Sequence, residues 1–267
     1  MSKRSSASEA REPAASAAPE FRRGFTPWLG FDERTGLLLV VLFGTVRMLL
    51  VLQANVTGSY QVVSVVFVAM ALLPVILLTR TGRRRVGLEM PARWRWMLAA
   101  ALAGAAASLL TFGLFSAAWG DSLRNAFVYI GGTYSVVPDD VSAADRAIYF
   151  VTFAVIGLTF SPIGEELLYR GIVHESLATQ WGGVRATLTD AAAFAMVHLA
   201  HFGIIYAGGG WSVFAAPALL WVVMMFASSL VFTAFRRLTG SVAGAIVSHA
   251  GFNLAMTVVI FYGLDLF

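Results

Sequence analysis

Residues 96–119 read WMLAAALAGAAASLLTFGLFSAAW, a run that contains no charged side chain. An α-helix rises about 1.5 Å per residue, so this run is long enough to cross the roughly 30 Å hydrocarbon core of a bilayer. Six further stretches meet or approach that length. The seven predicted spans are residues 35–53, 61–79, 96–119, 147–175, 186–203, 213–235 and 240–263. We therefore predict an all-α, polytopic membrane helix bundle of about seven transmembrane helices.

The composition of the whole chain agrees with a bilayer environment. Hydrophobic residues make up 58% of the 267 residues, and charged residues only 13%, about half of the roughly 25% typical of soluble domains. This excludes a soluble globular domain and a disordered chain. The chain has no cysteine, which excludes disulfide scaffolds, cysteine-ligated zinc, iron–sulfur clusters and thiol nucleophiles.

The boundaries of the spans follow from turn signals and from a polar N-terminal segment. Residues 1–33 are rich in Ala, Ser, Pro and charge, so we expect a disordered cytoplasmic tail before a transmembrane domain over residues 34–267. Glycine-containing turn signals separate several spans. These signals are Gly58-Ser59, Gly182-Gly183, Gly208-Gly209-Gly210 and Thr239-Gly240.

The basic residues predict the orientation of the chain. The net charge of +4 could suggest nucleic acid, but the arginines flank apolar stretches, so we predict a lipid bilayer as partner and no nucleic acid. With seven spans, the basic residues of the tail, of the connector 80–95 and of positions 185 and 236–237 lie on one side. The other side receives Arg124 and Arg146. The positive-inside rule then places the N-terminus in the cytoplasm and the C-terminus outside.

Ionisable residues inside three apolar spans are the candidate functional residues, because such groups are costly at membrane depth. Glu166 and Arg170 are four residues apart and can pair on one helix face, which leaves Glu165 free to face a cavity. Phe194 with His198, and His249 with Asn253, also share faces. By helix rise, Glu165, His198 and His249 lie at similar depths, roughly 13–18 Å inside, so three helices can converge on one site.

This set of groups predicts water activation. A buried carboxylate can take a proton from water, and a neutral imidazole can share that work or bind a metal. A second imidazole and an amide can donate hydrogen bonds to a developing oxyanion. Hydrolysis of a carbonyl compound, such as a peptide bond, needs these parts.

Structural interpretations of the same residues stand beside the functional one. Glu166–Arg170 can be an ion pair that only holds the fold, and each histidine can be an interhelical hydrogen bonder. We expect His201 to be interfacial, Arg47 to pair within the bundle and Asp190 to serve a helix N-terminus. His174-Glu175 begins a zinc-protease motif, but position 178 is alanine, so that motif fails.

In order along the chain, the motifs are Glu165-Glu166-x-x-x-Arg170, Phe194-x-x-x-His198 and His249-x-x-x-Asn253. With these motifs the chain resembles the CAAX protease and bacteriocin-processing (CPBP, or Abi) family of intramembrane endopeptidases, which includes the CAAX prenyl endopeptidases. The resemblance covers a protease-like core at about residues 147–263, and every motif position matches.

The resemblance implies a role for each motif residue. Glu165 with His198 would activate the attacking water, and His249 with Asn253 would bind the oxyanion. Glu166 and Arg170 would hold the motif helix, and Phe194 would pack beside the site. The cofactor stays open, since Glu165, His198 and His249 could hold zinc and a metal-free glutamate mechanism is equally compatible with the residues.

Our main hypothesis is a multi-pass protein of the plasma membrane that hydrolyses a peptide bond of a membrane-associated protein or peptide, with access from the cytoplasmic half. A transporter or proton relay that uses buried Glu and His is one alternative. A non-catalytic membrane adaptor or immunity protein on the same fold is another. The transporter hypothesis predicts flux without a peptide product, and the adaptor hypothesis predicts a phenotype that survives Glu165→Gln.

Overall fold

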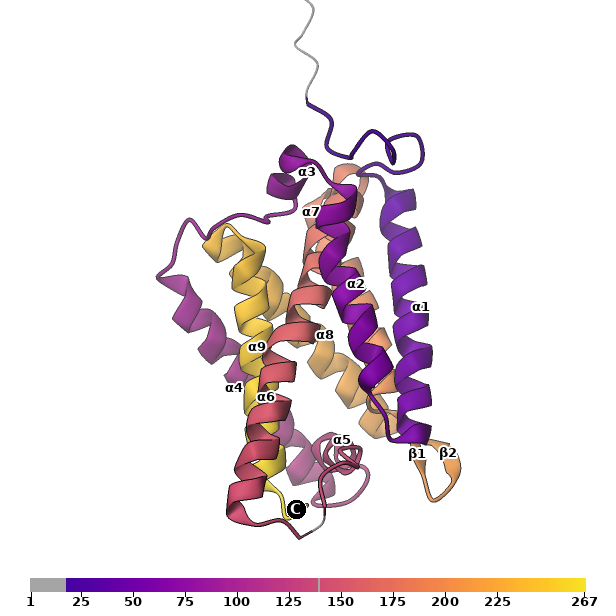
Figure 1. Cartoon of the computed structure of the whole chain (residues 1–267), viewed down its shortest axis with the longest axis vertical. Coiled ribbons are helices and arrows are strands. Elements are labelled where there is room, and N and C mark those ends of the chain that lie inside the picture. The colour runs from indigo at the N-terminus through magenta and orange to yellow at the C-terminus, as the bar shows by residue number, and fades with distance from the viewer. Residues whose placement is uncertain (1–17, 139) are drawn as a thin grey trace, which may run out of the picture.

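The computed structural model describes residues 18–138 and 140–267, which form a bundle of helices with one small β-hairpin (Figure 1). The elements, in chain order, are α1 (Glu33–Thr57), α2 (Gln61–Leu77), α3 (Arg80–Arg85), α4 (Trp96–Trp119), α5 (Ala126–Gly132), α6 (Ala143–Glu166), the π-helical segment η1 (Leu167–Val173), α7 (His174–Val197), the 3₁₀ turn η2 (His198–Ala200), β1 (Ile204–Ala207), β2 (Gly210–Val213), α8 (Ala215–Thr239), α9 (Val242–Val258) and the π-helical segment η3 (Val259–Gly263).

The predicted polytopic helical bundle is confirmed. Among the described residues, five helical segments are long and apolar enough to cross a membrane: α1, α4, the continuous stretch 143–200, α8, and α9 with η3. Helix α2, with 17 residues, is slightly shorter. The stretch 143–200 contains the predicted span 147–175 and most of the span 186–203. The count of seven spans and the orientation of the termini stay predictions.

The stretch 143–200 reverses its direction inside α7. Gly182 has the non-helical backbone angles φ 77° and ψ 159°, at the Gly182-Gly183 turn that the sequence predicts. His174 Nδ1 lies 2.7 Å from Asp190 Oδ2, although 16 residues of straight helix would separate these positions by about 24 Å. The chain therefore folds back at Gly182. The expectation that Asp190 serves a helix N-terminus is wrong, because its carboxylate is buried against His174 across this hairpin.

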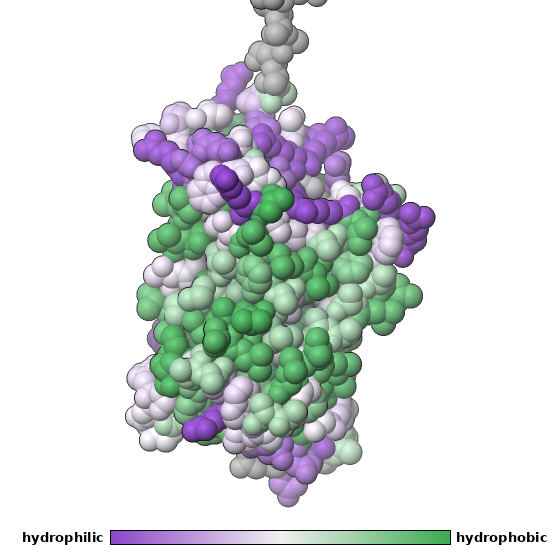
Figure 2. Space-filling view, turned by 180° about the vertical axis from the view of Figure 1, so that it is seen from behind, coloured by the Kyte–Doolittle hydropathy of each residue, from purple (hydrophilic) through white to green (hydrophobic). Residues whose placement is uncertain are grey.

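On the face shown in Figure 2, a hydrophobic belt lies between two more polar ends. Long apolar side chains on the outer faces of the helices are exposed, for example Leu38 on α1 and Leu98 on α4. At one end, Glu175 accepts hydrogen-bonding or ionic contacts from Arg85 of α3 and Arg236 of α8. We call this the arginine-rich end. It contains α3, and the opposite, arginine-poor end contains α5, β1 and β2 (Figure 1).

Glycines allow the helices that carry the candidate site to pack closely. A Cβ atom at Gly104 of α4 would lie 1.7 Å from the carbonyl oxygen of Ser248 on α9. A Cβ atom at Gly164 of α6 would lie 2.3 Å from the carbonyl oxygen of Phe67 on α2. Small residues at helix interfaces let backbones approach in this way. The backbones next to His249 and Glu165 are therefore held by direct contact with neighbouring helices.

Three local features differ from the sequence expectations. The segment after residue 203 forms the hairpin β1–β2, whose two-residue loop Gly208-Gly209 has positive φ at both positions, as tight hairpin turns require. The connector 120–146, which none of the predicted spans includes, contains the buried helix α5. The expected tail lies outside the described residues at positions 1–17, whereas Phe21 and Phe31 are buried, because both rings pack against apolar core side chains.

Candidate active site

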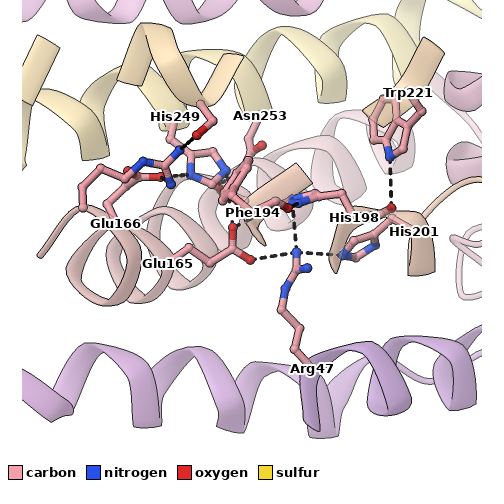
Figure 3. A network of polar contacts seen from close by, with 12 residues as sticks. Arg47, Glu165, Glu166, Phe194, His198, His201, Trp221, His249 and Asn253 are labelled. Atoms are coloured by element: carbon pink, nitrogen blue, oxygen red, sulfur yellow. Dashed lines mark hydrogen bonds and ion pairs between the residues drawn. The ribbon is translucent and has the colours of Figure 1, made fainter. Parts of the chain in front are cut away.

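Three segments that are distant in sequence bring an acid and two imidazoles together. Glu165 lies at the C-terminal end of α6, His198 at the start of η2 and His249 in the middle of α9. Glu165 Oε2 lies 3.9 Å from His198 Nε2 and 4.0 Å from His249 Nε2. All three residues are buried. The structure thus places the three titratable residues singled out in the sequence around one point (Figure 3).

The side chain of Glu166 is directed toward α9 and not toward the space between Glu165, His198 and His249. Its Oε1 accepts a hydrogen bond from Arg170 Nη1 at 3.1 Å, which is the pairing that the four-residue spacing predicts. The same oxygen lies 2.8 Å from His249 Nδ1. Arg170 also donates to Ser229 of α8, and its guanidinium lies 4.4 Å from the centre of the Phe194 ring. Glu166 and Arg170 therefore connect α6, η1, α8 and α9 and orient His249.

Asn253 and Phe194 complete the predicted set. Asn253 Nδ2 donates to the carbonyl oxygen of Gly157 on α6 at 2.9 Å, which fixes the orientation of the amide and leaves its second N–H without an acceptor among the described residues. The Phe194 ring lies 4.3 Å from the His198 ring and 5.6 Å from the His249 ring, between centroids. Phe194 thus packs between the two imidazoles.

The role of Arg47 could not be predicted from the sequence. This arginine of α1 is 1% exposed, and its Nη2 lies 2.7 Å from Glu165 Oε1. The same nitrogen lies 3.2 Å from His198 Nε2 and 3.2 Å from His201 Nε2 (Figure 3). A single arginine inside an apolar span was the available signal, and it indicated only that Arg47 pairs somewhere in the bundle. The structure identifies the partners as the candidate site itself.

The hydrogen-bond partners determine which ring nitrogens carry protons. His198 Nδ1 lies 2.6 Å from the carbonyl oxygen of Phe194, which can only accept, so Nδ1 is the donor. Nε2 of His198 is then left with a lone pair, which accepts from Arg47. In the same way, Glu166 makes Nδ1 of His249 a donor. In their neutral forms, both rings direct an acceptor nitrogen toward Glu165.

The donor set does not fit a metal ion in this arrangement. Within residues 18–138 and 140–267, no group of three His, Asp or Glu side chains is arranged to hold one. The lone pair that His198 would offer to a metal accepts a hydrogen bond from Arg47, whose cationic group lies 2.7 Å from Glu165. A second cation at this point would be repelled by the guanidinium.

A cavity of about 460 Å³ reaches the site from one half of the bundle. Its inner end is lined by Arg47, His198, His249 and Asn253, and its outer end by Tyr60 and other residues near the α1–α2 turn. That turn is at the arginine-poor end, because α3 follows the opposite end of α2 (Figure 1). The cavity therefore lies in the arginine-poor half of the bundle. From the positive-inside rule, we had expected the substrate to enter through the arginine-rich half.

His201 and Tyr60 form part of the cavity wall. His201 bonds Arg47 at the candidate site, a contact that the expectation of an interfacial His201 did not include. Its ring is stacked on Tyr60 at 6.4 Å between centroids. Burial raises the pKa of Tyr60 to about 12, so its hydroxyl remains protonated at neutral pH and donates to Asn55 Oδ1. These side chains give the cavity one polar wall.

The fold and the site together define a polytopic helical membrane protein with a buried carboxylate–imidazole centre at the end of a cavity. The comparison with known families agrees. Residues 147–255 match the family model described as type II CAAX prenyl endopeptidase Rce1-like, which confirms the resemblance to the CAAX protease family and supports a hydrolase. The match extends from α6 into α9 and contains all seven motif residues. No curated protein and no solved structure matched the chain.

Proposed function

We propose that the protein is an intramembrane endopeptidase, located in the plasma membrane, that hydrolyses a peptide bond of a membrane-associated protein or peptide. The observation that carries the proposal is the space between Glu165 Oε2, His198 Nε2 and His249 Nε2. Glu165 Oε2 has no hydrogen-bond partner among the described residues. It lies 4.0 Å from His249 Nε2, which carries a lone pair in the neutral ring. Two acceptors that face each other at this distance require a shared donor, and one water molecule supplies two O–H groups. His198 Nε2, 3.9 Å from the same oxygen, accepts from Arg47 and borders the same space.

In the proposed reaction, Glu165 takes a proton from this water as the water oxygen attacks the carbonyl carbon of the substrate, and His198 helps to position the water. The carbonyl oxygen becomes an oxyanion, which accepts a hydrogen bond from the remaining N–H of Asn253. In its protonated form, the His249 ring can donate a second hydrogen bond to the oxyanion from Nε2. As the C–N bond breaks, the proton held by Glu165 passes to the leaving nitrogen.

Arg47, Glu166 and Arg170 support the reaction by orientation. The guanidinium of Arg47 holds the non-reacting oxygen of Glu165, Oε1, at 2.7 Å, so that Oε2 is directed toward the histidines. Glu166 holds His249 in the same manner through Nδ1. These contacts agree with a rigid, pre-organised site, in which little free energy is needed to reorient the catalytic groups during the reaction.

The test compares peptides released from membranes that contain the intact chain, Glu165→Gln or His198→Ala, each with and without a zinc chelator. Glu89→Gln is the matched control, since Glu89 is an exposed glutamate outside the site. We expect release by the intact chain and by the control, and loss in the two site variants. Folded variants with undiminished release would refute the proposal. If the chelator abolished peptide release by the intact chain, a metal-free mechanism would be refuted.

A further inference from the structure

The exposure of the residues that line the cavity changes along its length. At the inner end, Arg47, His198 and His249 are buried. At the outer end, Gln61 of α2, Ser135 of the α5–α6 loop and other lining residues are exposed. The cavity is therefore open near the arginine-poor end and closed at the candidate site.

The lining of the cavity contains both polar and apolar side chains. Tyr60, His201 and Arg47 form a chain of polar contacts that leads to Glu165. The lining also contains large apolar side chains, including Phe160 of α6 and Met256 of α9. Water can follow the polar side chains, and bulky apolar groups can pack on the apolar ones. Such a passage suits an extended peptide with large apolar side chains next to the cleaved bond.

We propose that this peptide reaches the site from the arginine-poor side of the membrane, through the cavity between α2, α6 and the α5–α6 loop. The inference rests on the proposed function for the identity of the substrate, but the side of access rests on the cavity alone. If the positive-inside rule holds for this chain, the arginine-poor side faces away from the cytoplasm. The enzyme would then act on segments that are presented at the outer half of the bilayer.

The absence of cysteine from the chain allows a direct test with single-cysteine variants and a membrane-impermeant methanethiosulfonate reagent. Thr152 and Val151 are neighbours on α6 and both are exposed, but only Thr152 lines the cavity. Thr152→Cys is the probe and Val151→Cys its matched control. Ser135→Cys is a second probe at the outer end, and Arg84→Cys marks the arginine-rich face.

Each variant is treated in two vesicle preparations that expose opposite faces of the membrane. We expect Thr152→Cys and Ser135→Cys to react in the preparation in which Arg84→Cys is protected, and Val151→Cys, which faces lipid, to react at least tenfold more slowly. Reaction of both probes from the same face as Arg84→Cys, or reaction of neither probe, would overturn the proposal. This readout does not depend on catalysis, so it remains informative if the chain releases no peptide.

A second measurement links the cavity to the substrate. Modification of Thr152→Cys with a bulky reagent should lower peptide release at least tenfold, and the same treatment of Val151→Cys should leave release unchanged. Equal release by modified and unmodified Thr152→Cys would overturn the cavity as the substrate path. Absence of release by the unmodified cysteine-free chain would instead refute the proposed function.

Discussion

Arg47 on α1 and Glu165 at the end of α6 form a buried ion pair, with 2.7 Å between Nη2 and Oε1. Both side chains are essentially inaccessible to solvent. The pair joins the first helix of the bundle to the segment that matches the protease family, which begins at residue 147. The candidate site is therefore shared between the matched segment and a helix outside it.

The first prediction concerns the stability of this pair. Arg47→Met leaves the carboxylate of Glu165 buried without a counter-charge, and removal of one partner from a buried pair costs about 3–5 kcal/mol. Thermal unfolding of the detergent-solubilised protein measures the loss. The double variant Arg47→Met/Glu165→Gln should recover a large part of it, and Arg84→Met, at an exposed site, should change little. An Arg47→Met variant as stable as the parent would show that the pair is not important for the fold.

The second prediction separates the two adjacent glutamates. Both variants should lower stability, because Arg47 and Arg170 each lose a buried counter-charge. In the folded protein, Glu165→Gln should in addition lower the turnover of peptide by about 10²–10⁴-fold, the usual contribution of a general base, and Glu166→Gln should lower turnover far less. Turnover and thermal unfolding are measured on both variants. The assignment of roles would be reversed if Glu166→Gln abolished turnover in a protein of unchanged stability and Glu165→Gln did not.

The third prediction concerns Asn253. Asn253→Ala removes an N–H that can donate to the oxyanion, and loss of one such donor typically lowers kcat by about 10²–10³-fold. Asn55→Ala is the matched control. Asn55 also donates to a carbonyl oxygen, that of Ala200 at 2.8 Å, and accepts from Tyr60, so the control variant loses at least as many structural hydrogen bonds as Asn253→Ala. A similar kcat for the two variants would mean that Asn253 acts only in packing.

The fourth prediction tests the close packing of α4 against α9. Gly104→Ala places a Cβ atom against the backbone of Ser248, and overpacking of this kind costs about 1–3 kcal/mol. Gly113→Ala on the same helix meets no atom within 4 Å and should be neutral. Thermal unfolding compares the two variants. Because Ser248 precedes His249, we also expect lower turnover in Gly104→Ala only; equal behaviour of the variants would count against the packing argument.

The sequence predicted the features that depend on local composition and periodicity. Apolar length determined the helical spans, and the turn at Gly182 was predicted because positive φ favours glycine. The pairing of Glu166 with Arg170 follows from four-residue spacing within helical backbone. Each of these depends on residues that are close along the chain, so the sequence contains the necessary information.

Only the tertiary structure decided how the helices are rotated and tilted relative to one another. It paired Arg47 with Glu165, directed Glu166 to His249 and opened the cavity toward the arginine-poor end. Helix periodicity shows which residues share a face, but not which neighbour that face meets. That choice depends on contacts between distant segments, such as Gly104 with Ser248, and on the need of each buried charge to find a partner.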